Sequence, residues 1–158
     1  MEKREINVRR PLFDRLVDSE PRVDREVRPM RTLDRDGLKQ SVRRELELLF
    51  NTRGSSPAQR PPDSERTVID YGIPDLSEFS AANPDDRTRL ADELRRAALI
   101  YEPRLFDVQV RVVPAIGREA SLSASIEAVV LIEGVPEAVS FDVVMNVREG
   151  RVNVHVGA

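Results

Sequence analysis

Glu102, Pro103 and Arg104 are the residues of this chain whose types and spacing are best suited to chemistry or recognition. A carboxylate can act as a general acid, a general base or a docking anion, and a guanidinium can bind carboxylates through two parallel hydrogen bonds. Proline has no amide hydrogen and disfavours helical geometry in the residue before it, so this corner should be stiff. The sequence therefore predicts two opposite charges held at a fixed angle, which suits docking better than catalysis.

Two other interpretations of this corner compete with docking. Charged residues make up 34% of the chain, and most charged side chains are solvated surface groups whose ion pairs contribute little. Glu102 and Arg104 could instead act within the fold and pin the preceding helix to the following strand, in which case loss of one partner would destabilise the protein. The residue types alone leave all three interpretations open.

Apart from this corner, the sequence lacks the residue patterns of common catalytic and metal sites. The single histidine, His155, lies in a strand pattern between two valines and should face solvent, so it supports neither a metal cluster nor a nucleophile–base pair. Cysteine is absent, and neither a phosphate-binding glycine loop nor a Gly-x-Ser-x-Gly elbow is present. A glycosidase would need a protonated Glu102 and a second carboxylate about 5–10 Å away, whereas the adjacent Arg104 favours the ionised form. We therefore predict no enzymatic activity, no metal site and no cofactor.

Length and composition narrow the class of protein further. A chain of 158 residues is most simply one domain, and a hydrophobic content of 40% with 4% aromatic residues predicts an aliphatic core. The net charge is −3, and acids are interleaved with the basic residues between Arg22 and Arg60, which argues against a nucleic-acid partner. No apolar run approaches the roughly 18 residues of a membrane span, and no apolar segment follows the charged N-terminus. We therefore expect a cytoplasmic protein without a signal peptide or direct membrane insertion.

The first 33 residues form a charged extension punctuated by prolines. Within it, residues 11–17 are a short apolar island in which Leu12, Phe13 and Leu16 can share one face of a helical turn. A segment this short does not hold a helix by itself in water. We therefore predict that it docks, either on its own domain or on a partner.

Two long helices are predicted from the spacing of apolar residues, at about residues 34–52 and 84–102. Asn83 is a good helix cap and Pro84 occupies the favourable first helical position, while Glu102 before Pro103 should end the second helix. Residues 54–67, between the helices, form a proline-rich and polar linker.

From Leu105 onward the hydrophobic period changes from helical to two. Strict alternation predicts four strands with one buried face each, at about residues 105–113, 120–131, 138–147 and 151–156. Short connections make neighbouring strands antiparallel. The predicted fold is α+β, with helices packed on one face of a four-stranded antiparallel meander sheet in a single domain of residues 34–158.

Such a sheet has two edges, and an uncovered edge can pair with a strand of another chain. The last strand is either an open edge of this kind or merely a short and protected one.

Four segments in order resemble one known family, and together they extend over roughly residues 11–156. The first two are Pro-Leu-Phe-Asp-Arg-Leu at residues 11–16 and Ser-Val-Arg-Arg-Glu-Leu-Glu-Leu-Leu-Phe-Asn-Thr-Arg at residues 41–53. The other two are Ile-Asp-Tyr-Gly-Ile-Pro-Asp-Leu at residues 69–76 and Tyr-Glu-Pro-Arg-Leu at residues 101–105. Their order and spacing are similar to those of TssE subunits of bacterial type VI secretion baseplates. This family includes the gene-25 baseplate wedge protein of contractile-tailed phages.

The resemblance implies a structural subunit without a small-molecule substrate, built from helices on an antiparallel sheet. Its Glu-Pro-Arg motif, here Glu102, Pro103 and Arg104, would dock onto the baseplate wedge core, with Leu12, Phe13 and Leu16 as a second anchor. The partners implied are other wedge subunits and the contractile sheath, which would pair with a sheet edge. The baseplate would assemble in the cytoplasm at the inner membrane of a Gram-negative bacterium. The older family name includes "lysozyme", so peptidoglycan hydrolysis is the alternative function.

Overall fold

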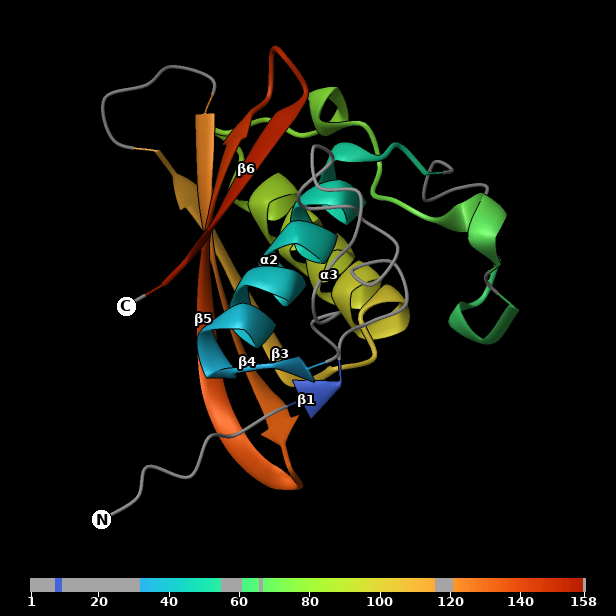
Figure 1. Ribbon diagram of the computed structural model, residues 1–158. Helices are drawn as coiled ribbons and strands as arrows, with labels where there is room; N and C mark the ends of the chain where they lie inside the picture. Colours follow the sequence, from blue (N-terminus) through green and yellow to red (C-terminus); the bar gives the residue numbers. More distant parts are fainter. Residues whose placement is uncertain (1–7, 10–31, 55–60, 66, 116–120, 158) are drawn as a thin grey trace, which may run out of the picture.

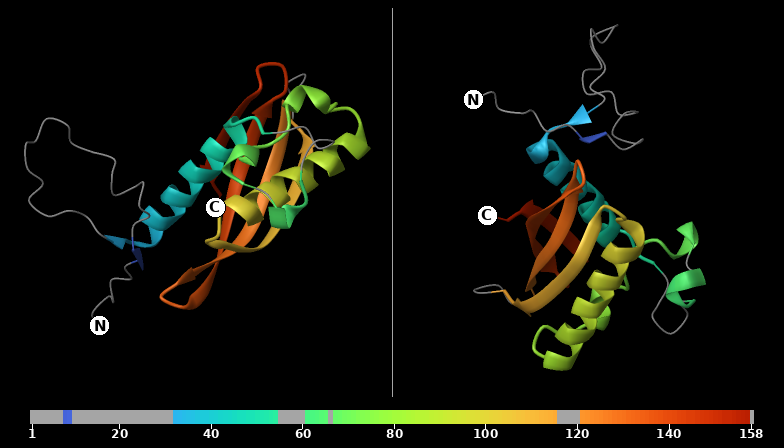
Figure 2. Two further views of the ribbon diagram at one scale, coloured as in Figure 1. Left: turned by 90° about the vertical axis from the view of Figure 1, so that its right-hand side faces the viewer. Right: turned by 90° about the horizontal axis from the view of Figure 1, so that it is seen from below.

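The computed structural model describes residues 8–9, 32–54, 61–65, 67–115 and 121–157, and its centre is a helix-covered sheet (Figure 1). Two long helices, α2 and α3, lie on the same side of this sheet, as both views of Figure 2 show. Helix α2 packs against strand β6 and helix α3 against strand β3. This arrangement confirms the predicted α+β class.

Helix α2 is Arg35–Asn51, and α3 is Pro84–Tyr101. Each begins at a side chain that accepts a hydrogen bond from a free backbone amide of the first turn, as helix caps do. Asp34 accepts from the Gly37 amide at 2.7 Å, and Asn83 accepts from the Asp85 amide at 3.0 Å. The helix bounds predicted from the sequence are therefore correct to within one residue.

The sheet has the order β3-β4-β5-β6, and every neighbouring pair is antiparallel. Its strands are Leu105–Pro114, Ser121–Ile132, Val135–Asn146 and Arg151–Val156. Glu133 and Gly134 both have positive φ, 51° and 82°, as the tight turn between two antiparallel strands requires. The predicted meander is thus observed, and each strand follows its neighbour in the sequence.

Strand β5 begins earlier than predicted, at Val135 and not at residue 138. Gly134 and Pro136 suggested a longer turn, because proline cannot donate a hydrogen bond to a neighbouring strand. Pro136 is nevertheless part of β5 and lies opposite Leu131 of β4. Proline is tolerated at this position because β6 pairs only with Phe141–Asn146. The missing amide hydrogen of Pro136 therefore costs no hydrogen bond to β6.

Phe106 is a second difference from the predicted pattern. Strict alternation puts Phe106 on the same face as Val108, but its side chain is 44% exposed whereas Leu105 and Val108 are buried. The register of β3 against β4 shifts between Phe106 and Gln109, and Asp107 has φ +50°. A bulge of this kind inserts one extra residue and changes the face to which side chains point.

Short elements complete the described chain. Strands β1 (Val8–Arg9) and β2 (Thr32–Leu33) pair with each other. Three 3-10 helices lie between α2 and α3, and the first of them falls inside the predicted linker; they are η2 (Asp63–Glu65), η3 (Val68–Asp70) and η4 (Leu76–Glu78).

The core lies between the helices and the sheet, and it is mostly aliphatic as the composition predicted. Its largest fully buried side chains include Phe50 from α2, Leu94 from α3 and Phe141 from β5. No helix in the described part of the chain has the length and apolar character that crossing a bilayer requires.

Candidate docking corner and sheet edges

The Glu102–Pro103–Arg104 corner joins α3 to β3. The Glu102 amide closes the last turn of α3 by donating to the Ala98 carbonyl at 2.9 Å, and the Leu105 amide then donates to the Glu102 carbonyl at 3.1 Å. Pro103 lies exposed at the tip of this turn. Backbone hydrogen bonds on both sides of the proline therefore fix the direction in which the chain leaves the helix.

The side chains of Glu102 and Arg104 bind each other through two parallel hydrogen bonds. The Arg104 Nε atom donates to Glu102 Oε1 at 2.7 Å, and its Nη2 atom lies 2.5 Å from Oε2. The Arg104 backbone amide also donates to Oε1, at 3.2 Å. The Glu102 side chain is 4% exposed and that of Arg104 is 24% exposed. Bidentate charge-assisted pairs of this geometry are among the strongest hydrogen-bonded contacts in proteins.

Ser41 on α2 is the third member of this arrangement. Arg104 Nη1 donates to the hydroxyl oxygen of Ser41, which is buried, at 2.8 Å. The guanidinium thereby connects the end of α3, the start of β3 and the first half of α2. Of the three interpretations open from the sequence, the contacts within the fold are observed directly, and docking onto a partner stays a prediction.

Tyr71 lies close to the same corner. Burial, followed by the negative charges of Glu45 and Glu102, raises the pKa of the Tyr71 hydroxyl above its ordinary value. Its ring packs edge-on against that of Tyr101, with 5.1 Å between centroids, and the Tyr101 hydroxyl donates to the Thr67 carbonyl at 3.3 Å. Tyr101 belongs to the segment 101–105 that the sequence singles out, whereas Tyr71 reaches the corner only through packing between distant parts of the chain.

Helix η3 carries an exposed apolar pair beside these tyrosines. Val68 is 89% exposed and Ile69 is 85% exposed. Thr67 and Asp70 form a capping box that holds this single turn in shape.

The Glu102 carboxylate is not arranged as a general acid. Both Glu102 oxygens accept hydrogen bonds from Arg104, whereas a general acid has to donate a proton to its substrate. Within the described ranges of the chain, no three histidine or acidic side chains come together as a metal site would need.

Strand β6 forms one end of the sheet, and α2 closes its outer edge with side chains. Asn51 Nδ2 donates to the Val152 carbonyl at 2.8 Å, and the Val152 amide donates to Asn51 Oδ1 at 3.0 Å. The Val154 amide donates to Glu47 Oε1 at 3.3 Å, and Arg43 Nη1 donates to the Val154 carbonyl at 3.2 Å. These three residues of α2 therefore occupy the backbone groups that a further strand would use.

The α2 ladder, Arg43, Glu47 and Asn51, was missed from the sequence. Its only signal is the four-residue spacing of long polar side chains, which places them on one helix face. Arg53 extends it, since its guanidinium donates to the Gly150 carbonyl. Of the two possibilities left open for the last strand, the structure therefore supports a short and protected edge.

Strand β3 forms the other end of the sheet, and its outer edge is partly guarded. The Ala115 amide donates to the Ser121 carbonyl at 3.0 Å, so the alternate positions 110, 112 and 114 of β3 direct their backbone groups away from β4. Arg95 Nε of α3 donates to the Val108 carbonyl at 3.0 Å, and Pro114 has no amide hydrogen. The outward groups of Val110 and Val112 have no hydrogen-bond partner among the described residues.

Leu12, Phe13 and Leu16, the second predicted anchor, lie outside the described residues. Their docking role therefore stays a prediction.

A helix-covered, four-stranded antiparallel sheet with a charged corner between α3 and β3 defines the class of this α+β domain. The model of one protein family, described as baseplate wedge protein gp25, matches residues 36–134, which is well over half of the chain. The chain belongs to this family of TssE-type, phage-tail-like baseplate proteins, whose role is structural. No curated protein gave a significant match.

Proposed function

We propose that this protein is a baseplate subunit of a contractile type VI secretion machine, in the cytoplasm at the inner membrane of a Gram-negative bacterium. Membership of the gp25 family supports a structural baseplate role and contact with other baseplate subunits. In this proposal the protein docks onto the wedge core through its charged corner and anchors the contractile sheath by pairing of strands.

The observation that carries the docking proposal is the fixed geometry of the corner. Glu102 and Arg104 bind each other, and Arg104 also binds Ser41, so the exposed Pro103 and the exposed quarter of Arg104 are held in place before any partner arrives. A surface that is ordered before binding loses less conformational entropy on association. The internal ion pair and the docking role are therefore compatible, because the pair presents the corner.

Binding of the purified wedge subunits to surface variants tests this proposal. Pro103→Asp adds a charge to the exposed tip and leaves the contacts between Glu102 and Arg104 available, so it should weaken wedge binding by about tenfold or more because a charge without a partner is desolvated. Pro84→Asp is the matched control, since Pro84 is an exposed proline at the start of α3, away from the corner, and an acid suits a helix N-terminus. Equal binding by both variants and the wild type would contradict docking through the corner.

Strand pairing with the sheath requires a row of backbone groups that the fold itself leaves available. The α2 ladder occupies those of β6 at Val152 and Val154. The sheath contact therefore has to use another part of the sheet edge.

A further inference from the structure

The face of the sheet away from the helices carries an apolar patch at one end. Helices α2 and α3 both lie on the other side of the sheet (Figure 2), and no described element packs on this outer face. Phe106 of β3 lies directly opposite Val129 of β4, and Val129 lies opposite Ala138 of β5. In the next row, Leu131 lies opposite Pro136. These five residues are the outer-face patch, in which Phe106 is 44% and Leu131 48% exposed.

The neighbouring rows of the same face are polar, which bounds the patch. The row beside it is Gln109, Glu127 and Ser140, and the row after that is Arg111, Ser125, Asp142 and His155. Single exposed apolar side chains are normal on a protein surface, whereas a cluster of them with a polar border is typical of an interaction site.

The bulge at Asp107 gives the patch its aromatic residue. The register shift between Phe106 and Gln109 turns Phe106 outward, although strict alternation would bury it. Asp107 has φ +50°, a left-handed conformation that residues other than glycine seldom adopt. An unfavourable backbone conformation whose effect is to expose a phenylalanine indicates that this side chain has a role outside the core.

The charged side chains that border the patch are acidic. They are the exposed Asp107 on β3, Glu127 on β4 and Glu133 in the turn between β4 and β5. None of the three forms an ion pair with another described residue. On this face Arg111 lies two rows away from Phe106. The patch therefore has a negative rim, which favours a positively charged partner.

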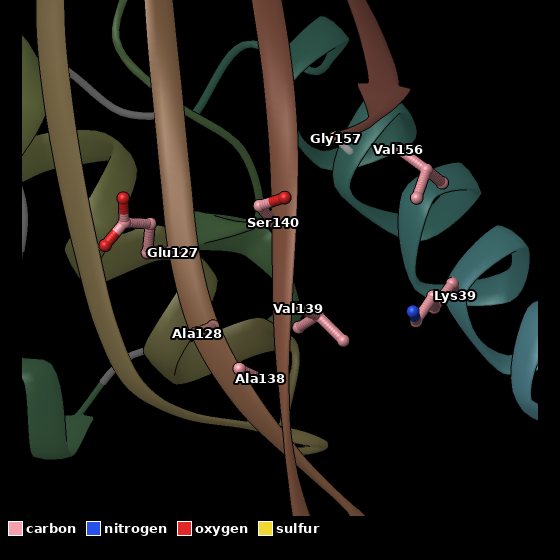
Figure 3. A pocket seen from close by; sticks show the side chains of 8 residues that line it. All are labelled: Lys39, Glu127, Ala128, Ala138, Val139, Ser140, Val156 and Gly157. Carbon is pink, nitrogen blue, oxygen red and sulfur yellow. The ribbon is translucent and has the colours of Figure 1, made fainter.

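A cavity of about 400 Å³ adjoins the patch at Ala138 and the rim at Glu127. In Figure 3, Val139 projects towards α2, whereas Glu127 projects away from it, on the face that carries the patch. Beside Ala138 the surface is therefore hollowed, and a partner side chain can enter there.

We propose that the outer-face patch binds an amphipathic helix of another protein, with lysine or arginine residues beside its apolar stripe. A helix is an element that buries one apolar stripe against one face of a sheet. The patch spans three strands, or about 10 Å, which matches roughly two helical turns. Apolar side chains of the helix would cover Phe106, Val129 and Leu131, and its basic side chains would meet the acidic rim.

A second copy of this chain fits the patch less well. Two identical patches facing each other would bring their acidic rims together, and juxtaposed like charges oppose association. The patch also lies on the opposite face of the sheet from Ser41 of α2, to which Arg104 of the docking corner binds. The inference therefore goes beyond the proposed function and does not depend on it.

Titration of the wild-type protein with two synthetic peptides tests this proposal. Each peptide has about 18 residues, or five helical turns, with leucines on one face. One has lysines beside the leucines, and the matched peptide has glutamate at those positions. The lysine peptide should bind and shift the amide resonances of Val129, Leu131 and Ala138, and the glutamate peptide should bind at least about tenfold more weakly. Equal binding of both peptides, or resonance shifts confined to other surfaces, would overturn the proposal.

Two matched serine variants supply the second arm. Phe106 and Val113 are both outer-face residues of β3, with exposed fractions of 44% and 40%. Phe106→Ser should weaken binding of the lysine peptide by about tenfold or more, because it removes the central aromatic contact, and Val113→Ser should leave binding unchanged. Equal effects of the two variants would contradict binding at the patch.

Neutralising the rim tests the charge argument separately. The triple variant Asp107→Asn, Glu127→Gln and Glu133→Gln should bind the lysine and glutamate peptides alike, because the attraction for lysine and the repulsion of glutamate are both removed. A preference for lysine that survives in this variant would contradict the role of the rim.

Two other occupants would be recognised in the wild-type protein without peptide. Dimers in analytical ultracentrifugation that Phe106→Ser abolishes would make the patch a contact between copies of this chain. Nuclear Overhauser contacts between the Phe106 ring and residues 10–31 would make it a contact within the chain. Either result would overturn the proposal, and a monomer without such contacts agrees with it.

Discussion

Replacing Arg104 with alanine gives the sharpest test of the corner. The substitution removes both side-chain contacts to the Glu102 carboxylate and the hydrogen bond to Ser41. Glu102 would remain, with its side chain 4% exposed in the intact fold. Removing one partner of a buried pair typically destabilises a protein by about 3–5 kcal/mol, because the remaining charge has no compensation. Arg104 is 24% exposed, so water reaches the pair and we expect the lower end, about 3 kcal/mol.

Urea unfolding of purified variants measures this free energy. Arg111→Ala is the matched control, since Arg111 is an exposed arginine of β3 and its loss should change stability by less than about 0.5 kcal/mol. Glu102→Gln in the Arg104→Ala background should recover about 1–2 kcal/mol, because it removes the charge that has lost its partner. A loss below about 1 kcal/mol for Arg104→Ala, or no recovery in the double variant, would refute the assignment of a structural role to the pair.

Two further predictions concern the edge of β6 and the partly buried Tyr71. Asn51→Ala leaves the Val152 amide and carbonyl without their partner and should lower the free energy of unfolding by about 1–3 kcal/mol. The control is Asn153→Ala, which changes an exposed side chain of β6 and should alter this free energy little. Equal effects of the two substitutions in a denaturation series would contradict the role of the α2 ladder. Because the pKa of Tyr71 is raised in the fold, its contribution to stability is complete below the unfolded pKa of about 10 and is lost as the pH rises through the folded pKa. Ultraviolet titration of Tyr101→Phe, which leaves Tyr71 as the single tyrosine, should show ionisation later than in the unfolded chain, and coincident curves would contradict the burial of this hydroxyl.

Much of the fold could be predicted because its signals are local. Asn83 with Pro84, and Glu102 with Pro103, mark both ends of α3 within a few residues of sequence. The alternation of apolar residues after Leu105 likewise gave four strands, since each strand has one buried face. The bulge at Asp107 could not be predicted because alternation does not reveal a positive φ, and strict alternation therefore puts Phe106 on the wrong face.

The site was harder to predict because its contacts join distant parts of the chain. Spacing alone did not decide whether Glu102 and Arg104 bind each other, and the contact to Ser41 joins residues 63 positions apart. The α2 ladder joins Asn51 to Val152, which are 101 positions apart. The helical period of α2 places these polar side chains on one face, but it does not say which strand they bind.

An electron cryomicroscopy map of the assembled baseplate tests the central claim most directly. The account predicts that the chain is present in the wedge, with Pro103 and the exposed part of Arg104 buried against a wedge subunit. A wedge that assembles without this chain, or a map in which the corner formed by Glu102, Pro103 and Arg104 faces solvent, would contradict it.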